Sequence, residues 1–391
     1  MADFHFETKL RLALREAAER ELRRGRVDRT AASGRSALRT TRRSLVPAAL
    51  VLVTLIALIV PVVLLTSGRS QHQPVRQPKV VDRFSLADSL GGAVTADGSL
   101  WIDDKGRSQL VRVDPRTHRV TARFPAPGDV SVAPTSGSLW ALLTSPANAG
   151  GFTASSLIRV GLRTGGVAAR IPLRTPSGER FWGFALAAGE EGVWVLGTTP
   201  TWHDRGSLGV LRIDPQTGRA TTLIALPYGW GPDGIALRGR DLWALAVGSR
   251  QQGLLRFDAR TGSRLSDVRI LLPNGNLRDD PAPGTFGFAG DALIASVHGG
   301  FARIDPTTGQ VLWRWHRSSG QGVQAWTVAA GMIWAAVQQS GASDRLVEVA
   351  PNDGHVLTGV NLDEFGTAGI AAIDNELWVT TTGGTAVIVW R

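Results

Sequence analysis

The chain has 391 residues, including 46 glycines and 13 tryptophans but no cysteine, which excludes disulfide frameworks, thiolate metal sites and thiol nucleophiles. Its formal net charge is +10, but residues 1–44 carry 12 basic and 6 acidic side chains, and residues 67–79 add three more basic ones. The remainder is nearly neutral, so the composition argues against a nucleic acid partner, which would need clustered Lys and Arg.

Residues 1–44 are predicted to be a basic cytoplasmic leader. Residues 6–24 within it place Leu10, Leu14 and Ala17 on one face and Glu–Arg pairs four residues apart on the others, which predicts a short amphipathic helix. Such a helix lies on anionic lipid or docks a cytoplasmic partner, and the sequence favours the first.

Residues 45–66, LVPAALVLVTLIALIVPVVLLT, contain no charged side chain. At about 1.5 Å per residue they reach roughly 33 Å, which matches the ~30 Å hydrocarbon core of a bilayer. We therefore expect a single transmembrane helix through which the chain contacts the membrane. A cleaved signal peptide is the alternative, but the leader is long and no small-residue cleavage pattern follows the apolar run.

Arginines predict the orientation of this span. Arg35, Arg39, Arg42 and Arg43 crowd its N-terminal side, whereas the linker of residues 67–79 spreads its three cations over a longer stretch. By the positive-inside rule, the N-terminus is cytoplasmic and everything after the linker is extracytoplasmic at the cell membrane.

Residues 80–391 are built from repeats. A two-residue signature, mostly Leu-Trp, ends at seven positions with spacings of 39 to 54 residues, which is the range for four-stranded propeller blades. These positions are Trp101, Trp140, Trp194, Trp243, Ile294, Trp334 and Trp378. The fold class is therefore all-β, with a seven-bladed β-propeller. Six or eight blades stay open because the fifth repeat carries Ile294.

Each signature but the last is followed by a hairpin motif such as LVRVDPRTHRV or VLRIDPQTGRA. Alternating apolar residues predict a strand, Asp-Pro begins a tight turn, and Thr-Gly supplies the positive φ that leads into the next strand. A blade therefore consists of an inner strand, the signature strand, the Asp-Pro strand and an outer strand. We interpret the Trp, Asp-Pro and Thr-Gly residues as packing and turn chemistry.

The last repeat lacks an outer strand, because it ends at GGTAVIVWR. Residues 79–87, KVVDRFSLA, resemble outer strands such as HRVTARFPA and precede the first inner strand. The N-terminal strand is therefore predicted to complete the C-terminal blade, which removes an open edge.

Loop lengths differ between the two ends of the predicted blades. One end has short, uniform turns, and the other carries long irregular loops, where binding usually lies. Aromatic and histidine residues outside the repeat fall there, and we predict ligand binding by Trp182, Trp202, His203, Trp230, His298 and Trp326. The acidic pairs Asp103/Asp104, Asp279/Asp280 and Asp363/Glu364 could bind Ca²⁺, but solvated loop charge explains them better.

No catalytic motif is assigned: the chain lacks G-x-S-x-G, H-E-x-x-H and a Walker loop. No catalytic residue, metal ligand or cofactor can be assigned. The sequence leaves enzymatic activity uncertain and favours recognition over catalysis.

The pattern LW(V/A/I) followed by (L/V)xR(I/V)DPxTGxV over residues 80–391 resembles the bacterial propeller superfamily of streptogramin B lyase-like, NHL-like and YVTN-like repeat proteins. The resemblance implies the fold. It would also imply a surface lyase or hydrolase at the channel mouth, but LWVTTT and LWALAV replace the lyase-type Trp-Phe-Thr-Glu strand. The first hypothesis is thus a membrane-anchored binding or sensing module with an unknown extracytoplasmic ligand or protein partner, and the lyase is the alternative.

Overall fold

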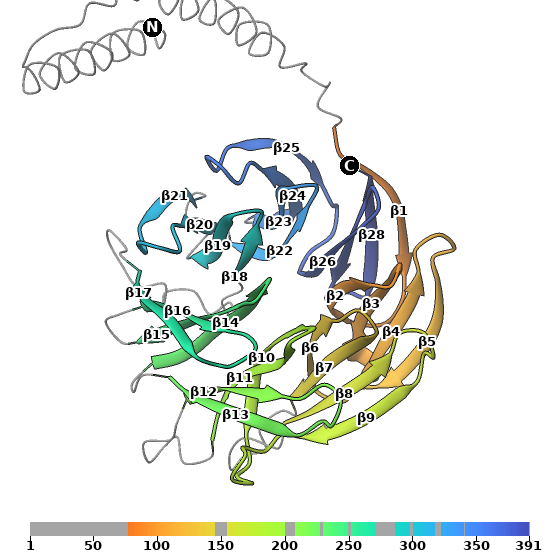
Figure 1. Cartoon of the computed structure of the whole chain (residues 1–391). Helices are drawn as coiled ribbons and strands as arrows, with labels where there is room; N and C mark the ends of the chain where they lie inside the picture. The colour runs from red at the N-terminus through yellow and green to blue at the C-terminus, as the bar shows by residue number, and fades with distance from the viewer. Residues whose placement is uncertain are drawn as a thin grey trace, which may run out of the picture. The chain divides into compact units, whose positions relative to one another are not determined.

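The computed structural model describes residues 77–144, 155–199, 208–226, 230–248, 252–270, 286–297, 300–316, 322–339 and 341–390. They form seven four-stranded antiparallel sheets around a central axis (Figure 1). The predicted seven-bladed propeller is confirmed. The expected leader, the span at residues 45–66 and most of the linker lie outside the described residues. Within the described ranges, no helix is both long and apolar enough to cross a membrane.

The first four blades follow the chain in order, each from its inner to its outer strand. Blade 1 also contains the 3-10 helix η1 (Lys105–Arg107), which follows its second strand. Their strands are β2 (Leu90–Ala96), β3 (Ser99–Asp104), β4 (Gln109–Asp114) and β5 (Arg119–Pro125) in blade 1; β6 (Asp129–Pro134), β7 (Ser138–Thr144), β8 (Ser155–Gly161) and β9 (Val167–Pro172) in blade 2; β10 (Trp182–Gly189), β11 (Gly192–Thr198), β12 (Leu208–Ile213) and β13 (Ala220–Ala225) in blade 3; β14 (Trp230–Arg238), β15 (Asp241–Gly248), β16 (Gln252–Asp258) and β17 (Arg264–Arg269) in blade 4.

The last three blades follow the same order, except that the outer strand of blade 7 comes from the other end of the propeller sequence. Their strands are β18 (Phe286–Ala289), β19 (Ala292–Val297), β20 (Gly300–Ile304) and β21 (Val311–His316) in blade 5; β22 (Val323–Ala329), β23 (Met332–Gln339), β24 (Ala342–Val349) and β25 (Val356–Asn361) in blade 6; β26 (Thr367–Ile373), β27 (Glu376–Thr381), β28 (Thr385–Trp390) and β1 (Lys79–Ser85) in blade 7.

The core consists of seven apolar clusters, each shared by two neighbouring blades. The signature residue of each second strand is buried in the cluster with the next blade, as Trp101 is between blades 1 and 2. Burial of large apolar side chains at every interface is the main term that holds the blades together. The signature is thus a packing residue, as the sequence predicted.

Arginines cover four of the signature tryptophans. Arg112 on β4 stands opposite Trp101 in the register, and its guanidinium lies 5.7 Å from the centre of the indole. The same pairing recurs in blades 2, 3 and 4. A guanidinium at this distance from an indole is a cation–π contact. This explains the Arg in the motif xxRxDP, which the sequence left without a role.

Blade 5 replaces its signature tryptophan with other aromatics. Ile294 is fully buried, and Phe301 on the next strand stacks on Trp315 at 5.0 Å and contacts Trp313 edge-on at 6.1 Å. The indole N–H of Trp313 also donates to the carbonyl of Pro351 in blade 6. The large aromatic side chains of this blade thus lie on its third and fourth strands. Blade 5 is still a four-stranded sheet, and the propeller has seven blades.

Strand β1 closes the ring, as predicted. It pairs antiparallel with β28, from Lys79 opposite Trp390 to Ser85 opposite Thr385, and the two strands lie side by side in Figure 1. The last blade therefore contains both the first and the last strand of the propeller. Because Lys79 lies at the short-turn end of β28, the chain enters the propeller at that end.

His118 fastens this closure from blade 1. Its ring stacks on Phe84 of β1 at 5.5 Å, meets Trp378 edge-on at 5.3 Å and hydrogen-bonds Asp82 at 2.9 Å. His118 has φ of 56°, at the turn position where five other blades have a positive-φ glycine. A non-glycine residue in this conformation costs free energy. The turn of blade 1 is thus strained at His118, and the contacts of the same side chain stabilise the closing strand β1.

Candidate functional site

The two ends of the propeller have different backbone chemistry. At the short-turn end, four aspartates each accept hydrogen bonds from the backbone N–H groups two and three residues further along the chain. They are Asp114, Asp214, Asp258 and Asp305. These donors hold the pKa of each carboxyl below its ordinary value. The repeated chemistry stabilises turns, and it distinguishes no single blade as a site.

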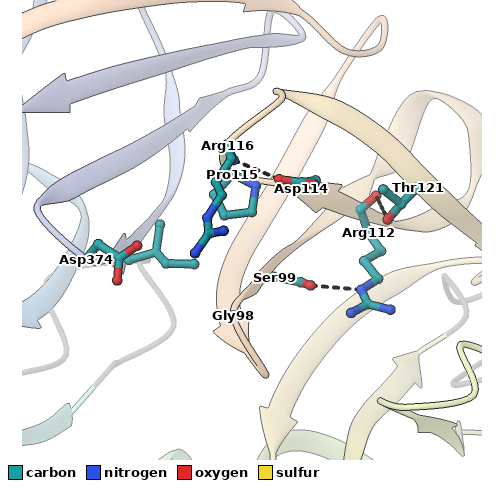
Figure 2. Close-up of a pocket in the computed structure, with 9 residues that line it drawn as sticks. Gly98, Ser99, Arg112, Asp114, Pro115, Arg116, Thr121 and Asp374 are labelled. Atoms are coloured by element: carbon teal, nitrogen blue, oxygen red, sulfur yellow. Dashed lines mark hydrogen bonds between the residues drawn. The ribbon is translucent and has the colours of Figure 1, made fainter.

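A pocket of about 480 Å³ also lies at the short-turn end, lined by residues of blades 1 and 7 (Figure 2). Its polar groups mostly bond one another: Arg112 Nε donates to Ser99 Oγ at 2.9 Å, and the N–H of Arg116 donates to Asp114 at 2.8 Å. Asp374 faces it from blade 7. The pocket is largely a by-product of the repeated turn.

The loop end differs because five inner strands contain a β-bulge there. The register of β10 jumps from Gly183 to Ala185 with no matching jump on β11, so Phe184 is an extra residue. The same one-residue excess occurs at Asp233 of β14, Gln324 of β22 and Ala368 of β26. In β2, Gly91 and Gly92 together oppose one residue of β3. Bulges re-aim side chains and interrupt pairing, and they are frequent next to active sites.

The five bulges occupy equivalent positions. Phe184, Asp233, Gln324 and Ala368 each stand ten residues before the signature tryptophan of their blade, and Gly91 stands ten before Trp101. The inner strands lie around the axis (Figure 1), so the five bulges lie around the axis at the loop end, in blades 1, 3, 4, 6 and 7. We call the set Gly91, Gly92, Phe184, Asp233, Gln324 and Ala368 the bulge ring. It is the candidate site, and the sequence analysis missed it.

Side chains from the preceding blade hold two of the bulges in place. In blade 2, Ser155 Oγ accepts the N–H of Gly183 at 3.1 Å, and Thr144 Oγ donates to the carbonyl of the same glycine. In blade 7, Thr380 Oγ donates to the carbonyl of Gly91 in blade 1 at 2.7 Å. Buried hydrogen bonds of this kind fix the local backbone. The bulges are thus supported conformations that the fold positions.

The side chains of the ring differ from blade to blade. Phe184 leaves 37% of its surface exposed, and Gln324 is exposed with its amide nitrogen donating to Gln338 Oε1 at 2.9 Å. A Cβ built at Gly92 would meet nothing within 4 Å, so that blade leaves open space. One part of the mouth thus offers an aromatic ring and an amide, and another part offers bare backbone. Such an asymmetric mouth can select a ligand, whereas a symmetric one could not orient it.

The predicted site residues separate into three groups. Trp182 and Trp230 begin β10 and β14 at the loop end, and Trp182 is half-buried there. Trp326 lies inside β22 with its ring near Gly287 of blade 5, where it packs in the cluster between these blades. Trp202, His203 and His298 lie outside the described residues. Phe184 and Gln324 were not predicted.

The acidic pairs do not behave as solvated loop charge throughout. Asp103 and Asp104 are 2% and 1% exposed at the end of β3, and Asp104 caps η1 by accepting the N–H of Arg107. Asp363 pairs with Arg83 at 2.8 Å. The interpretation as solvated charge was therefore wrong for Asp103 and Asp104, which continue a buried strand. Among the described residues no group of three His, Asp or Glu side chains could hold a metal ion, and Asp279/Asp280 lie outside them.

No protein-family model matches the chain, and no curated protein matches its sequence. Solved propellers match its fold. The virginiamycin B lyase of Staphylococcus aureus is 15% identical, with 81% of this chain and 100% of that chain covered and a TM-score of 0.56. A streptogramin B lyase is 19% identical, with 80% and 97% covered and a TM-score of 0.56.

A third structure extends the comparison beyond lyases. The β-propeller domain of Cps50 (Swd1) from Myceliophteria thermophila is 12% identical, with 80% of this chain and 99% of that chain covered and a TM-score of 0.56. These likenesses confirm the propeller fold and the resemblance inferred from the repeats. Identities this low say nothing about activity, because one fold hosts many functions.

Proposed function

We propose that the chain is a membrane-anchored, extracytoplasmic propeller that binds a ligand or protein through its loop end. The observation that carries the proposal is the bulge ring: equivalent bulges, which carry different residue types, lie around the axis at the loop end. The bulge itself recurs as a structural feature does, but the residue that it presents differs between blades. Hydrogen bonds from Ser155 and Thr144 hold the bulge of blade 3, and one from Thr380 holds that of blade 1.

The chain enters the propeller at the end opposite to the proposed binding face. Residues 45–66 supply the proposed span, and the linker leads into β1 at Lys79, which lies at the short-turn end. The bulge ring therefore lies at the end of the propeller opposite to the entry of the chain.

The anchoring is tested with the full chain in cells. We expect it in the membrane fraction, with the propeller degraded by protease added outside intact cells and residues 1–44 protected. Deletion of residues 45–66 should abolish membrane association. Protection of the propeller from external protease would reject the proposed topology.

Binding is tested by thermal shift on residues 74–391 with cell-wall fragments, divalent metals and cyclic peptides as probes. We expect one class to raise the Tm, and Phe184→Ala or Gln324→Ala to abolish the rise. The controls are Leu265→Ala and Leu312→Ala, because these side chains are exposed on outer strands far from the ring. A rise that survives both ring variants would place the site elsewhere. Turnover of the bound compound would support the lyase alternative.

A further inference from the structure

The loop of residues 362–366 between blades 6 and 7 presents an exposed aromatic side chain at the loop end. Phe365 is 62% exposed, the highest value among the large exposed apolar side chains of the described residues. Single exposed apolar residues are common on protein surfaces. What distinguishes Phe365 is the way the fold holds its loop.

Backbone hydrogen bonds fix the loop at both ends. The N–H of Asp344 in β24 donates to the carbonyl of Glu364 at 2.7 Å, and the N–H of Leu362 donates to the carbonyl of Asp344 at 2.9 Å. The N–H of Thr382 donates to the carbonyl of Gly366 at 2.8 Å. Residues on either side of Phe365 are thus tied to two different blades. The ring projects from a backbone that has little freedom to move.

A buried carboxylate adds to this support. Asp344 is fully buried, and its Oδ2 accepts both the N–H and the hydroxyl of Thr367, at 2.7 and 2.8 Å. Its Oδ1 has no hydrogen-bond partner within the described part of the chain. Burying a carboxylate with one oxygen unsatisfied is unfavourable. The unsatisfied oxygen thus belongs to Asp344, the residue whose backbone also holds the loop.

Strand β1 holds the loop from outside. The guanidinium of Arg83 donates to the carbonyl of Leu362 at 3.0 Å and to the carboxylate of Asp363 at 2.8 Å. Asp363 itself has φ of 55°, which is unfavourable for a residue other than glycine. Asp tolerates this conformation better than most residues, so Asp363 sets the turn of the loop.

We propose that Phe365 is a docking anchor for a second protein, which receives the ring in an apolar pocket rimmed by basic side chains. The inference rests on the proposed function and names the partner of its loop end. A rigid, protruding aromatic gains contact area at low entropic cost, which is the property of interface hot spots. A ring on a convex loop offers no enclosing cavity for a small molecule.

The charges beside the ring determine the chemistry of the partner. Asp363 is 72% exposed on its side chain even when paired with Arg83, and Glu364 is partly exposed. Because Arg83 compensates Asp363, Glu364 leaves one net negative charge beside the ring, which complements a basic rim and would be repelled by anionic lipid headgroups. This charge favours a protein over a lipid surface.

The test places a photo-crosslinking phenylalanine analogue at Phe365, Phe184 or Leu265 of the full chain in intact cells. Leu265 is the matched control, because it is 51% exposed on an outer strand. We expect a discrete protein adduct from position 365 and none from position 265. Glu364→Lys should reduce the adduct about 10-fold or more, because it inverts a charge at the rim of the contact. In a second arm, we expect residues 74–391 not to bind phosphatidylcholine–phosphatidylglycerol vesicles.

Several outcomes would overturn the proposal. The crosslinking arm overturns it if position 365 gives no adduct, if position 265 gives an equal adduct, or if Glu364→Lys leaves the adduct unchanged. The vesicle arm overturns it if residues 74–391 bind vesicles and Phe365→Ala abolishes that binding. An adduct from position 184 without one from 365 rejects the anchor and leaves the proposed function standing. No adduct from either position, together with no thermal shift, rejects both. Once the partner is known, Phe365→Ala should weaken its binding about 10- to 100-fold.

Discussion

At the scale of the residue, the repeats are read most clearly from turn chemistry. Asp114, Asp214, Asp258 and Asp305 were predictable as turn residues from the motif Asp-Pro or Asp-Ala before Thr, and each accepts backbone N–H groups as that motif requires. The buried state of Asp103 and Asp104 was not predictable. Two adjacent carboxylates have the same appearance in a sequence whether they continue a strand or lie in a loop.

These four aspartates predict an acid-sensitive fold. Their lowered pKa values mean that the folded state favours the ionised form. The stabilisation is present above the unfolded pKa of about 3.9 and is lost as the pH falls through the lower folded value. Between about pH 5 and pH 2.5, the Tm of residues 74–391 should therefore fall more steeply than the Tm of a variant with all four aspartates changed to Asn. Equal slopes for the two proteins would reject the assignment.

His118 gives a second prediction at this scale. His118→Gly removes the contacts with Phe84, Trp378 and Asp82, which are worth about 0.5–1.5 kcal/mol per ring contact and about 1 kcal/mol for the hydrogen bond. It also relieves the positive φ, worth about 1 kcal/mol. We expect a net loss of about 1–3 kcal/mol in urea unfolding.

A matched substitution separates the two contributions. Gly165 holds the same turn position in blade 2 with φ of 63°, and a Cβ there would meet nothing within 4 Å. Gly165→His therefore measures the conformational cost alone, about 1 kcal/mol. If His118→Gly stabilised the protein by the amount that Gly165→His destabilises it, the clamp would contribute nothing.

At the scale of the element, the strand order of each blade followed from the sequence, and the bulges did not. A bulge adds one residue at the point where an inner strand leaves a long, irregular loop, so its extra length is hidden in the variable length of that loop. The distance of ten residues to the signature does not reveal it either, because Val130 stands at the same distance from Trp140 in blade 2, which has no bulge there. The predicted tryptophans at the same end were chosen for their large side chains. The bulge ring is defined by the backbone register instead.

The inner strands give a prediction that depends on how closely they approach. A Cβ at Gly369 of β26 would come within 2.7 Å of the backbone nitrogen of Ala93 and 2.9 Å of the Cα of Gly92. Because backbone atoms cannot move aside, Gly369→Ala should destabilise the fold by about 1–3 kcal/mol. Gly92→Ala is the control, with a change within about 0.5 kcal/mol. Equal effects in urea unfolding would mean that blades 7 and 1 are not in close contact here.

At the scale of the whole molecule, ring closure was predictable because a missing outer strand at one end of the repeats matched a spare one at the other. The register of β1 on β28 confirms it. The partner of the loop end was not predictable, because a partner's chemistry is recorded in surface contacts such as those of Phe365, which depend on the folded loop. The membrane topology stays a prediction from residues 45–66 and the flanking arginines.

Removal of β1 tests the closure. A chain that begins at residue 86 exposes the edge of β28 and the partners of Phe84, so we expect the Tm to fall by roughly 10 °C or more and the protein to self-associate. A synthetic peptide of residues 77–87 should restore the Tm and the monomer in sedimentation, and a scrambled peptide should not. An unchanged Tm without β1 would mean that the strand is dispensable.

The pairing of β1 with β28 also governs the order of events during synthesis. The ribosome makes β1 before every blade and β28 after almost all of them, so the first strand waits for its partner until nearly the whole propeller has been translated. Until then the nascent chain carries an unpaired strand edge, which is prone to wrong pairing. A premature stop codon anywhere before β28 would leave the ring open and not merely shorter by one blade. For this protein, translation to the last strand is the condition for completing the fold.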